Sequence, residues 1–144
     1  MDCVITCSVK KNKVSDKYIN EVVSLISNTF PKYKNFGLSI NLVGEKKIKK
    51  LNNAHRNVNK TTDVLAFALQ DTESFKNEKQ DLGDVFICLP KIKNQAKEFR
   101  VSFEEEFARI LVHGVLHLLG FDHIQEIDAK KMFSLQEKIV KKLI

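Results

Sequence analysis

Residues 107–119 are apolar on almost every side of a helix, and this segment constrains the fold more than any other part of the chain. Its apolar members cover the whole helical turn: Phe107, Ile110, Leu111, Val112, Val115, Leu116, Leu118 and Leu119. A helix that is apolar all round must be buried. We therefore expect this helix at the centre of the molecule, with the other elements packed around it.

Two histidines interrupt this apolar helix, and a third follows it. His113 and His117 are four residues apart, so their imidazoles lie on one face at a separation of ~6 Å. Gly120 can adopt the left-handed conformation that ends a helix and turns the chain back, which brings His123 towards the other two. Three imidazoles can bind one Zn²⁺ at ~2.0–2.1 Å and leave the fourth position open, as in catalytic zinc sites. The pattern predicts one Zn²⁺ per chain, held by His113, His117 and His123.

The alternative is that these histidines are unconnected. Buried imidazoles on an apolar helix need polar partners, however, and a single metal ion supplies a partner for both His113 and His117. The sequence therefore favours a metal centre over isolated core histidines.

Gly114 follows the first histidine and separates this motif from a related one. The spacing His-x3-His-x5-His also occurs in a class of zinc proteases, which place Glu directly after the first histidine as the general base. This chain has glycine there, so hydrolysis of a peptide is less favoured. Glycine inside a helix also costs ~1 kcal/mol relative to alanine. We interpret the missing side chain as room for a substrate to approach the metal.

Patterns along the rest of the chain predict one α+β domain, a four-stranded mixed sheet packed with about five helices. The strands are expected over residues 3–9, 37–43, 63–69 and 85–89, with a polar surface loop over 70–81. The helices are expected over about 16–30, 45–56, 90–100, 103–119 and 126–143. Apolar stripes are expected at Ile48, Leu51 and Ala54 in the second helix, and at Ile127, Met132, Leu135, Ile139 and Leu143 in the last.

The 144 residues suit one domain over residues 1–144. No stretch approaches the ~18 apolar residues of a membrane-spanning helix, and residues 1–7 lack the basic start and apolar core of a secretory signal. Cys3 and Cys7 are expected on one strand, ~13 Å apart and too distant for a disulfide. We therefore expect reduced, buried cysteines in a cytoplasmic protein that has no membrane partner.

The positive charge of the chain is unevenly distributed. The net charge is +6 at pH 7, with +8 over residues 1–60, −6 over 61–128 and +4 over 129–144. Such asymmetry favours a basic surface that faces a polyanion such as a nucleic acid. Lysines on solvated helix faces are the alternative, so charge alone supports nucleic-acid binding only weakly.

The segment 113–123 resembles the signature of the YbeY family of bacterial endoribonucleases. Two further blocks resemble the family in the same order: residues 51–56 with 61–67, and residues 82–88. The resemblance covers residues 36–125. The chain departs from the family at two places. Ala66 stands where the family often has Ser, and Phe67 is followed by Ala68 and Leu69 where the family commonly has a Pro.

This resemblance implies a metal-dependent, single-strand-selective endoribonuclease, which acts in 3′-end maturation of the small-subunit (16S) rRNA and in ribosome quality control. Its partners would be the rRNA precursor and the ribosome or its small subunit. The resemblance also implies that His113, His117 and His123 bind zinc and that Arg56 is catalytic. The physical chemistry of Arg56 agrees, because a planar guanidinium binds phosphate bidentately and stabilises charge that develops on it.

Several alternatives remain open. The chain as a whole is either this nuclease, a metal hydrolase of another substrate such as a peptide, or a ribosome-assembly binding protein whose zinc is structural. Arg56 is otherwise a surface cation near a helix C-terminus. Nearby lysines either extend a phosphate-binding groove or form a solvated helix face: Lys46, Lys47, Lys49, Lys50 and Lys60.

Three further residues have two interpretations each. Asp122 either supports a ligating histidine or is a turn residue. His55 is a surface histidine rather than a fourth ligand. Arg109 precedes His113 by one helical turn and follows Glu105 by one turn. An ion pair between Glu105 and Arg109 within the helix explains both residues without a role at the metal site.

Overall fold

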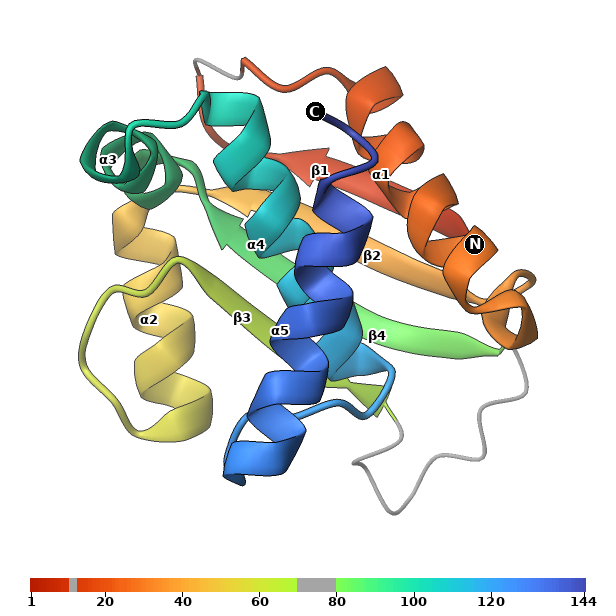
Figure 1. The fold of residues 1–144 in the computed structure, drawn as a ribbon. Helices are drawn as coiled ribbons and strands as arrows, with labels where there is room; N and C mark the ends of the chain where they lie inside the picture. The colour runs from red at the N-terminus through yellow and green to blue at the C-terminus, as the bar shows by residue number, and fades with distance from the viewer. Residues whose placement is uncertain (11–12, 70–79) are drawn as a thin grey trace.

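The computed structural model describes residues 1–10, 13–69 and 80–144, and over these residues the chain folds into one sheet of four strands and five α-helices (Figure 1). The strands are β1 (Asp2–Cys7), β2 (Gly37–Val43), β3 (Val64–Ala68) and β4 (Asp81–Cys88). The helices are α1 (Asp16–Thr29), α2 (Glu45–Arg56), α3 (Leu89–Phe99), α4 (Phe103–Leu118) and α5 (Glu126–Val140), with a short 3₁₀ helix at Pro31–Tyr33. The predicted α+β fold is confirmed.

The strands lie in the order β1-β2-β4-β3, so β1 and β3 form the two edges of the sheet. β1, β2 and β4 run parallel, whereas β3 runs antiparallel to β4, as a mixed sheet requires. β4 begins at Asp81, four residues before the expected start at Val85. Gly83 explains the difference, because its φ of +127° and the nearby Phe67 carbonyl leave no room for a side chain. Most of the loop expected over 70–81 lies outside the described residues.

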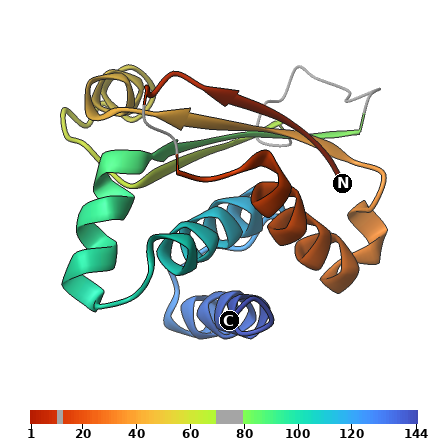
Figure 2. The same ribbon diagram turned by 90° about the horizontal axis from the view of Figure 1, so that it is seen from above.

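Helix α4 lies in the middle of the molecule, between the sheet and α5, with α1 and α3 on either side of it (Figure 2). α2 covers the opposite face of the sheet, over β3 and β4. The α4 side chains of Phe107, Leu111 and Leu116 are fully buried, as expected for a helix that is apolar nearly all round. The predicted central helix is therefore confirmed, and the elements around it hold it firmly in place.

Gly114 is the point where α4 packs closely against the sheet. A Cβ atom there would lie 2.9 Å from Val85 Cγ1 on β4 and 3.1 Å from Val64 Cγ2 on β3. Gly114 is buried, and a side chain there would point towards the two valines and not into the cavity in front of the histidines. The expectation that this glycine opens a path for the substrate is therefore wrong. Its missing side chain allows the helix and the sheet to approach each other.

Two positions expected in the core are exposed. Ile127, in the first turn of α5, is 81% exposed, and Ala54, in the last turn of α2, is also exposed. The buried residues of the same helices include Met132 and Ile139 in α5 and Ile48 in α2. Helical spacing identifies the apolar face of a helix, but it does not show where along the helix the neighbouring element ends.

The cysteines are free thiols, as predicted, but their burial differs from the prediction. Cys88 is buried, Cys3 is half-buried, and Cys7 is exposed. Cys7 lies at the end of β1, an edge strand that pairs only with β2 among the described strands. In the described part of the chain, every helix is too short or too polar to cross a membrane.

Candidate metal centre

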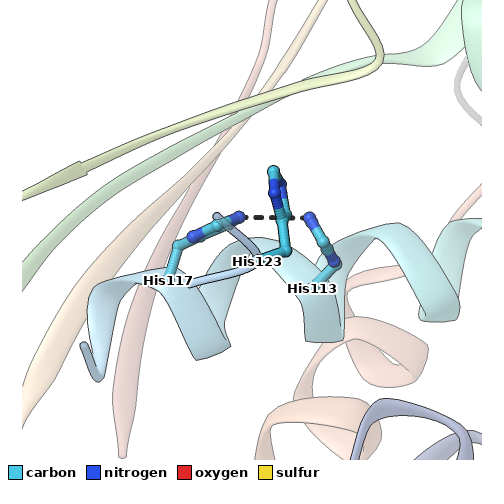
Figure 3. Close-up of side chains that lie close together, drawn as sticks. All are labelled: His113, His117 and His123. Carbon is cyan, nitrogen blue, oxygen red and sulfur yellow. Dashed lines mark hydrogen bonds between the residues drawn. The ribbon is translucent and has the colours of Figure 1, made fainter. Parts of the chain in front are cut away.

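His113, His117 and His123 meet at the carboxyl end of α4 (Figure 3). One nitrogen of each ring lies within 4.8 Å of the others, and the Nε2 atoms of His113 and His117 are 3.1 Å apart. His113 and His117 are partly buried, whereas His123, on the loop after the helix, is exposed. The structure thus brings together the three side chains that the sequence pattern selects.

The turn at Gly120 brings His123 back to the helix. Gly120 adopts a φ of +97°, and its N–H donates to the His117 carbonyl at 3.0 Å. The N–H of Phe121 donates to the Leu116 carbonyl at 3.0 Å. These two bonds with a left-handed glycine define a Schellman motif, which ends α4 and reverses the chain. The role predicted for Gly120 is confirmed.

The same turn orients the ring of His117. The Phe121 carbonyl lies 3.0 Å from His117 Nδ1, and because a carbonyl only accepts, Nδ1 is the nitrogen that carries the proton. The lone pair of His117 is then on Nε2, the nitrogen that faces His113. Metal-binding histidines are commonly oriented by a hydrogen bond from the other ring nitrogen.

Burial keeps the helix histidines neutral. It is the main reason that the pKa of His117 falls to about 4, and the rings of His113 and His123 lower this pKa further. Burial also lowers the pKa of His113, against an opposing hydrogen bond with Gln136. At pH 7 both rings are therefore uncharged, which is the form that binds a metal.

The donor set fits a zinc ion. Two nitrogens that each lie ~2.0–2.1 Å from a tetrahedral Zn²⁺ are ~3.3 Å from each other. The separation of 3.1 Å between His113 Nε2 and His117 Nε2 is close to that value. Three imidazole ligands would also leave one tetrahedral position for a water or a substrate atom.

A cavity of about 560 Å³ opens in front of the histidines, and Arg56 belongs to its lining. Arg56 is the last residue of α2, and its Nη2 donates to the Ala66 carbonyl on β3 at 3.4 Å. The structure therefore brings Arg56 from α2 to the same cavity as His113 and His117 from α4 and His123 from the loop that follows. In the described part of the chain the bond to Ala66 is the one hydrogen bond of the Arg56 side chain, which leaves other guanidinium N–H groups for a ligand in this cavity.

The lysines near Arg56 in sequence do not share this position. They are exposed, and among the described residues they are not part of the cavity lining: Lys46, Lys47, Lys49, Lys50 and Lys60. The groove that they were expected to extend stays a prediction, since a solvated helix face gives the same exposure.

The structure places Asp122 in a turn and His55 on the surface. The carboxylate of Asp122 accepts the N–H of Ile124 at 3.2 Å, which is the bond of a turn residue, although Asp122 also lines the cavity. His55 is exposed and its ring packs against Phe67 at 4.9 Å between centroids. It lies outside the histidine cluster.

Arg109 forms the expected ion pair and two more. It contacts Glu105 at 3.1 Å, Glu106 at 3.2 Å and Glu137 of α5 at 2.9 Å. Glu106 is buried, and burial raises its pKa. The hydrogen bond from Arg109 lowers the pKa of Glu137. The cluster fastens α5 to α4 one turn before His113.

Sequence reasoning missed two residues of α5 that touch the histidines. Gln136 Oε1 lies 2.8 Å from His113 Nδ1, and the ring of Phe133 lies 5.9 Å from that of His113. A signal for Gln136 was present, because it follows the buried Met132 by four residues and precedes the buried Ile139 by three. A polar side chain on the buried stripe of a helix requires a polar partner.

Comparison with known proteins relates the whole chain to one family. The family model described as Endoribonuclease YbeY matches residues 4–144. The Endoribonuclease YbeY of Sulfurihydrogenibium sp. (strain YO3AOP1) is 40% identical over 141 residues, which cover 97% of this chain and 91% of that protein. The Endoribonuclease YbeY of Caldicellulosiruptor bescii is 41% identical over 140 residues and 89% of each chain.

The fold is also similar to that of a solved structure. The solution structure of TM1509 from Thermotoga maritima is similar with a TM-score of 0.65 and 29% identity, over 96% of this chain and 87% of that one. The sequence match includes the helix that carries His113 and His117, the turn to His123, and Arg56. From the family model and these relatives, we conclude that the chain belongs to the Endoribonuclease YbeY family.

Proposed function

We propose that the chain is a zinc-dependent endoribonuclease that cleaves a single-stranded rRNA precursor in 3′-end maturation of 16S rRNA and takes part in ribosome quality control. Membership of the family supports an endoribonuclease with a role in rRNA processing. The observation that carries the metal-dependent part is the cavity in which three histidine rings and Arg56 meet. The comparisons do not favour the peptide-hydrolase or binding-protein alternatives.

In this proposal each residue of the cavity has a separate task. His113, His117 and His123 would hold one Zn²⁺ per chain through one ring nitrogen each. A bound zinc ion would supply Lewis-acid activation of water and of the scissile phosphate. Arg56 binds the phosphate through its planar guanidinium and stabilises the negative charge that develops during cleavage. The exposed position of His123 keeps the centre open to a substrate.

The setting of this activity is part of the proposal. One domain over residues 1–144 carries it, in the cytoplasm, with the ribosome or its small subunit as the partner that presents the RNA. The free thiols of Cys3, Cys7 and Cys88 support a reducing compartment. The positive charge of residues 1–60 supports a polyanionic partner.

Metal analysis and RNA cleavage on the same preparations test the proposal. We expect about one zinc per chain, and cleavage of a labelled single-stranded RNA that stops with a chelator and returns with added zinc. His117→Ala should lose both zinc and cleavage. His55→Ala is the matched control, because it removes an exposed histidine outside the cluster and should retain both.

Two outcomes would overturn parts of the proposal. A His117→Ala variant with the zinc content of the wild type would exclude the three-histidine site. Cleavage that neither chelator nor His117→Ala changes would come from a contaminant, and a binding protein with structural zinc would then be the better explanation.

A further inference from the structure

Gln136 connects the metal centre to the ion-pair cluster of Arg109. Gln136 lies on α5 and is 5% exposed, and the oxygen and the nitrogen of its amide contact different partners. Gln136 Oε1 lies 2.8 Å from His113 Nδ1, and Gln136 Nε2 lies 3.1 Å from Glu137 Oε2. The bond to His113 has two possible directions, because either nitrogen of a neutral imidazole can carry the proton.

Arg109 holds Glu137 in place and keeps it ionised. Arg109 Nε lies 2.9 Å from Glu137 Oε2, and Nη2 lies 3.0 Å from Oε1, which is a bidentate pair. Hydrogen bonding to Arg109 is the largest cause of the lowered pKa of Glu137, and the bond from Gln136 also lowers it. At neutral pH Glu137 is therefore a carboxylate, which accepts hydrogen bonds and donates none.

This carboxylate decides which way the amide of Gln136 points. With the amide reversed, its oxygen would face the oxygen of Glu137, and two acceptors would be in contact. The amide NH₂ therefore faces Glu137, and the amide oxygen faces His113. Since this oxygen only accepts, it places the proton on His113 Nδ1 and the lone pair on Nε2, which faces His117 Nε2 at 3.1 Å. The two Nε2 lone pairs then face each other, but this contact between neutral acceptors costs less than a contact between the amide oxygen and the charged carboxylate of Glu137.

We propose that Gln136 is a positioning residue, which selects the Nδ1-protonated tautomer of His113, and that Glu137 sets the direction of its amide. The selected tautomer presents His113 Nε2 as a ligand towards His117 and His123. The selection exists in the metal-free protein, whereas its benefit to zinc binding rests on the proposed function.

A purely structural role for Gln136 makes a different prediction. If Gln136 and Glu137 only fastened α5 to α4, their replacement would lower the stability of the protein but leave the proton of His113 on the same nitrogen. Glu105 is the matched control, because it contacts Arg109 Nη2 at 3.1 Å and belongs to α4, away from Gln136. Glu137→Gln and Glu105→Gln each remove one carboxylate from Arg109, but only Glu137→Gln removes the acceptor that directs the amide.

The test is ¹⁵N NMR of the histidine rings in the metal-free full chain. We expect the wild type and Glu105→Gln to hold His113 with the proton on Nδ1. Glu137→Gln should give a mixture of the two tautomers, because either orientation of the Gln136 amide then has a partner. Gln136→Met keeps the size of the side chain but removes the acceptor, and it should also abolish the preference.

Zinc affinity provides a second measurement. Loss of a partner that orients a metal-binding histidine typically weakens binding ~10–100-fold, so we expect a loss of this size for Gln136→Met and no loss for Glu105→Gln. A wild-type His113 with the proton on Nε2 would overturn the proposal, as would equal tautomer populations in Glu137→Gln and Glu105→Gln. If the tautomer pattern is as expected but the wild type binds no zinc, the metal site fails and the tautomer selection stands.

Discussion

Arg56 and the histidines reach one cavity from separate helices, so their tasks can be separated one residue at a time. Arg56 is the last residue of α2, while the ring nitrogens that surround the metal position come from α4 and the loop after it. A residue that contacts the phosphate, and not the metal, affects the reaction without affecting the metal content.

Arg56→Ala should therefore retain zinc and thermal stability but lose RNA cleavage. Removal of one donor to a developing charge typically costs ~10²–10³ in rate, and this is the loss that we expect in single-turnover cleavage. Arg56→Lys should recover only part of it, because an ammonium keeps the charge without the bidentate geometry. Lys47→Ala, an exposed cation on the same helix, is the control. Cleavage by Arg56→Ala at the wild-type rate would make Arg56 a bystander.

Two carboxylates that share Arg109 should respond to pH in opposite directions. The bond from Arg109 lowers the pKa of Glu137 below 4.5, so its stabilising effect is complete above 4.5 and is lost as pH falls through the lowered value. Burial raises the pKa of Glu106 above 4.5, so its effect is complete below 4.5 and is lost as pH rises through the raised value.

Urea unfolding at several pH values between about 3 and 7 measures both effects. As pH rises, the free energy of unfolding of the wild type should increase relative to Glu137→Gln and decrease relative to Glu106→Gln. Parallel profiles for the two variants would contradict the assignment.

At the scale of the elements, the contact between α4 and the sheet depends on Gly114. In Gly114→Ala the new methyl group would press on Val85, 2.9 Å away, and overpacking of this kind costs about 1–3 kcal/mol. The better helix propensity of alanine returns about 1 kcal/mol. We therefore expect a net loss of up to about 2 kcal/mol in unfolding free energy, measured by urea denaturation.

Gly37→Ala is the control for this prediction. The nearest atom to a Cβ at Gly37 is the Asp2 carbonyl oxygen at 3.6 Å, an ordinary contact, so this variant should be as stable as the wild type. If Gly114→Ala proved more stable than the wild type, α4 would not be in close contact with β3 and β4.

Local sequence patterns predicted a strand or helix best where residues at both of its ends marked the boundary. The predicted ranges 37–43 and 45–56 agree with β2 and α2 residue for residue, because alternation ends at Gly44 and the helix begins at Glu45. β4 was predicted too short. Its first residues include Gly83, whose place in the strand depends on the close approach of the β3 backbone, and the local sequence does not show that contact. The packing role of Gly114 was missed for the same reason, since it depends on residues of another element.

The site was predictable as far as it lies within one segment. His113, His117 and His123 are close in sequence, and helix geometry with the Gly120 turn predicted their meeting. Arg56 was identified through the family resemblance and not by geometry. Gln136 was missed, because its place beside His113 depends on how α5 packs against α4.

For the molecule as a whole, the charge distribution predicts how RNA binding depends on salt. The net charge of +8 over residues 1–60 includes the exposed lysines of α2, the helix that ends at Arg56. Neutralisation of phosphates releases counterions, so the affinity for single-stranded RNA should fall steeply with salt. Replacement of Lys46 and Lys50 by alanine should reduce the slope by about 1–2 units if both contact phosphates.

The matched control replaces two exposed lysines at the end of α5, Lys138 in the helix and Lys141 directly after it, and should leave the slope unchanged. The measurement is the RNA dissociation constant across a salt series. An unchanged slope in the α2 variant would identify its lysines as a solvated face, and equal affinity for duplex RNA would contradict single-strand selectivity.

If the cluster binds zinc as proposed, the turn at Gly120 couples metal binding to the order of the end of α4. The bonds from Gly120 and Phe121 close the helix, and the Phe121 carbonyl in turn holds His117, so one local opening event releases both the turn and a ligand. A ligand present at 100 times its dissociation constant opposes such an opening by ~2.7 kcal/mol. Hydrogen exchange at the amides of Gly120 and Phe121 should therefore slow by about a hundredfold, while β2 in the sheet is unaffected. Under the proposed function, loss of zinc would leave the last turn of α4 free to fray, so the order of this turn would report whether the site is occupied.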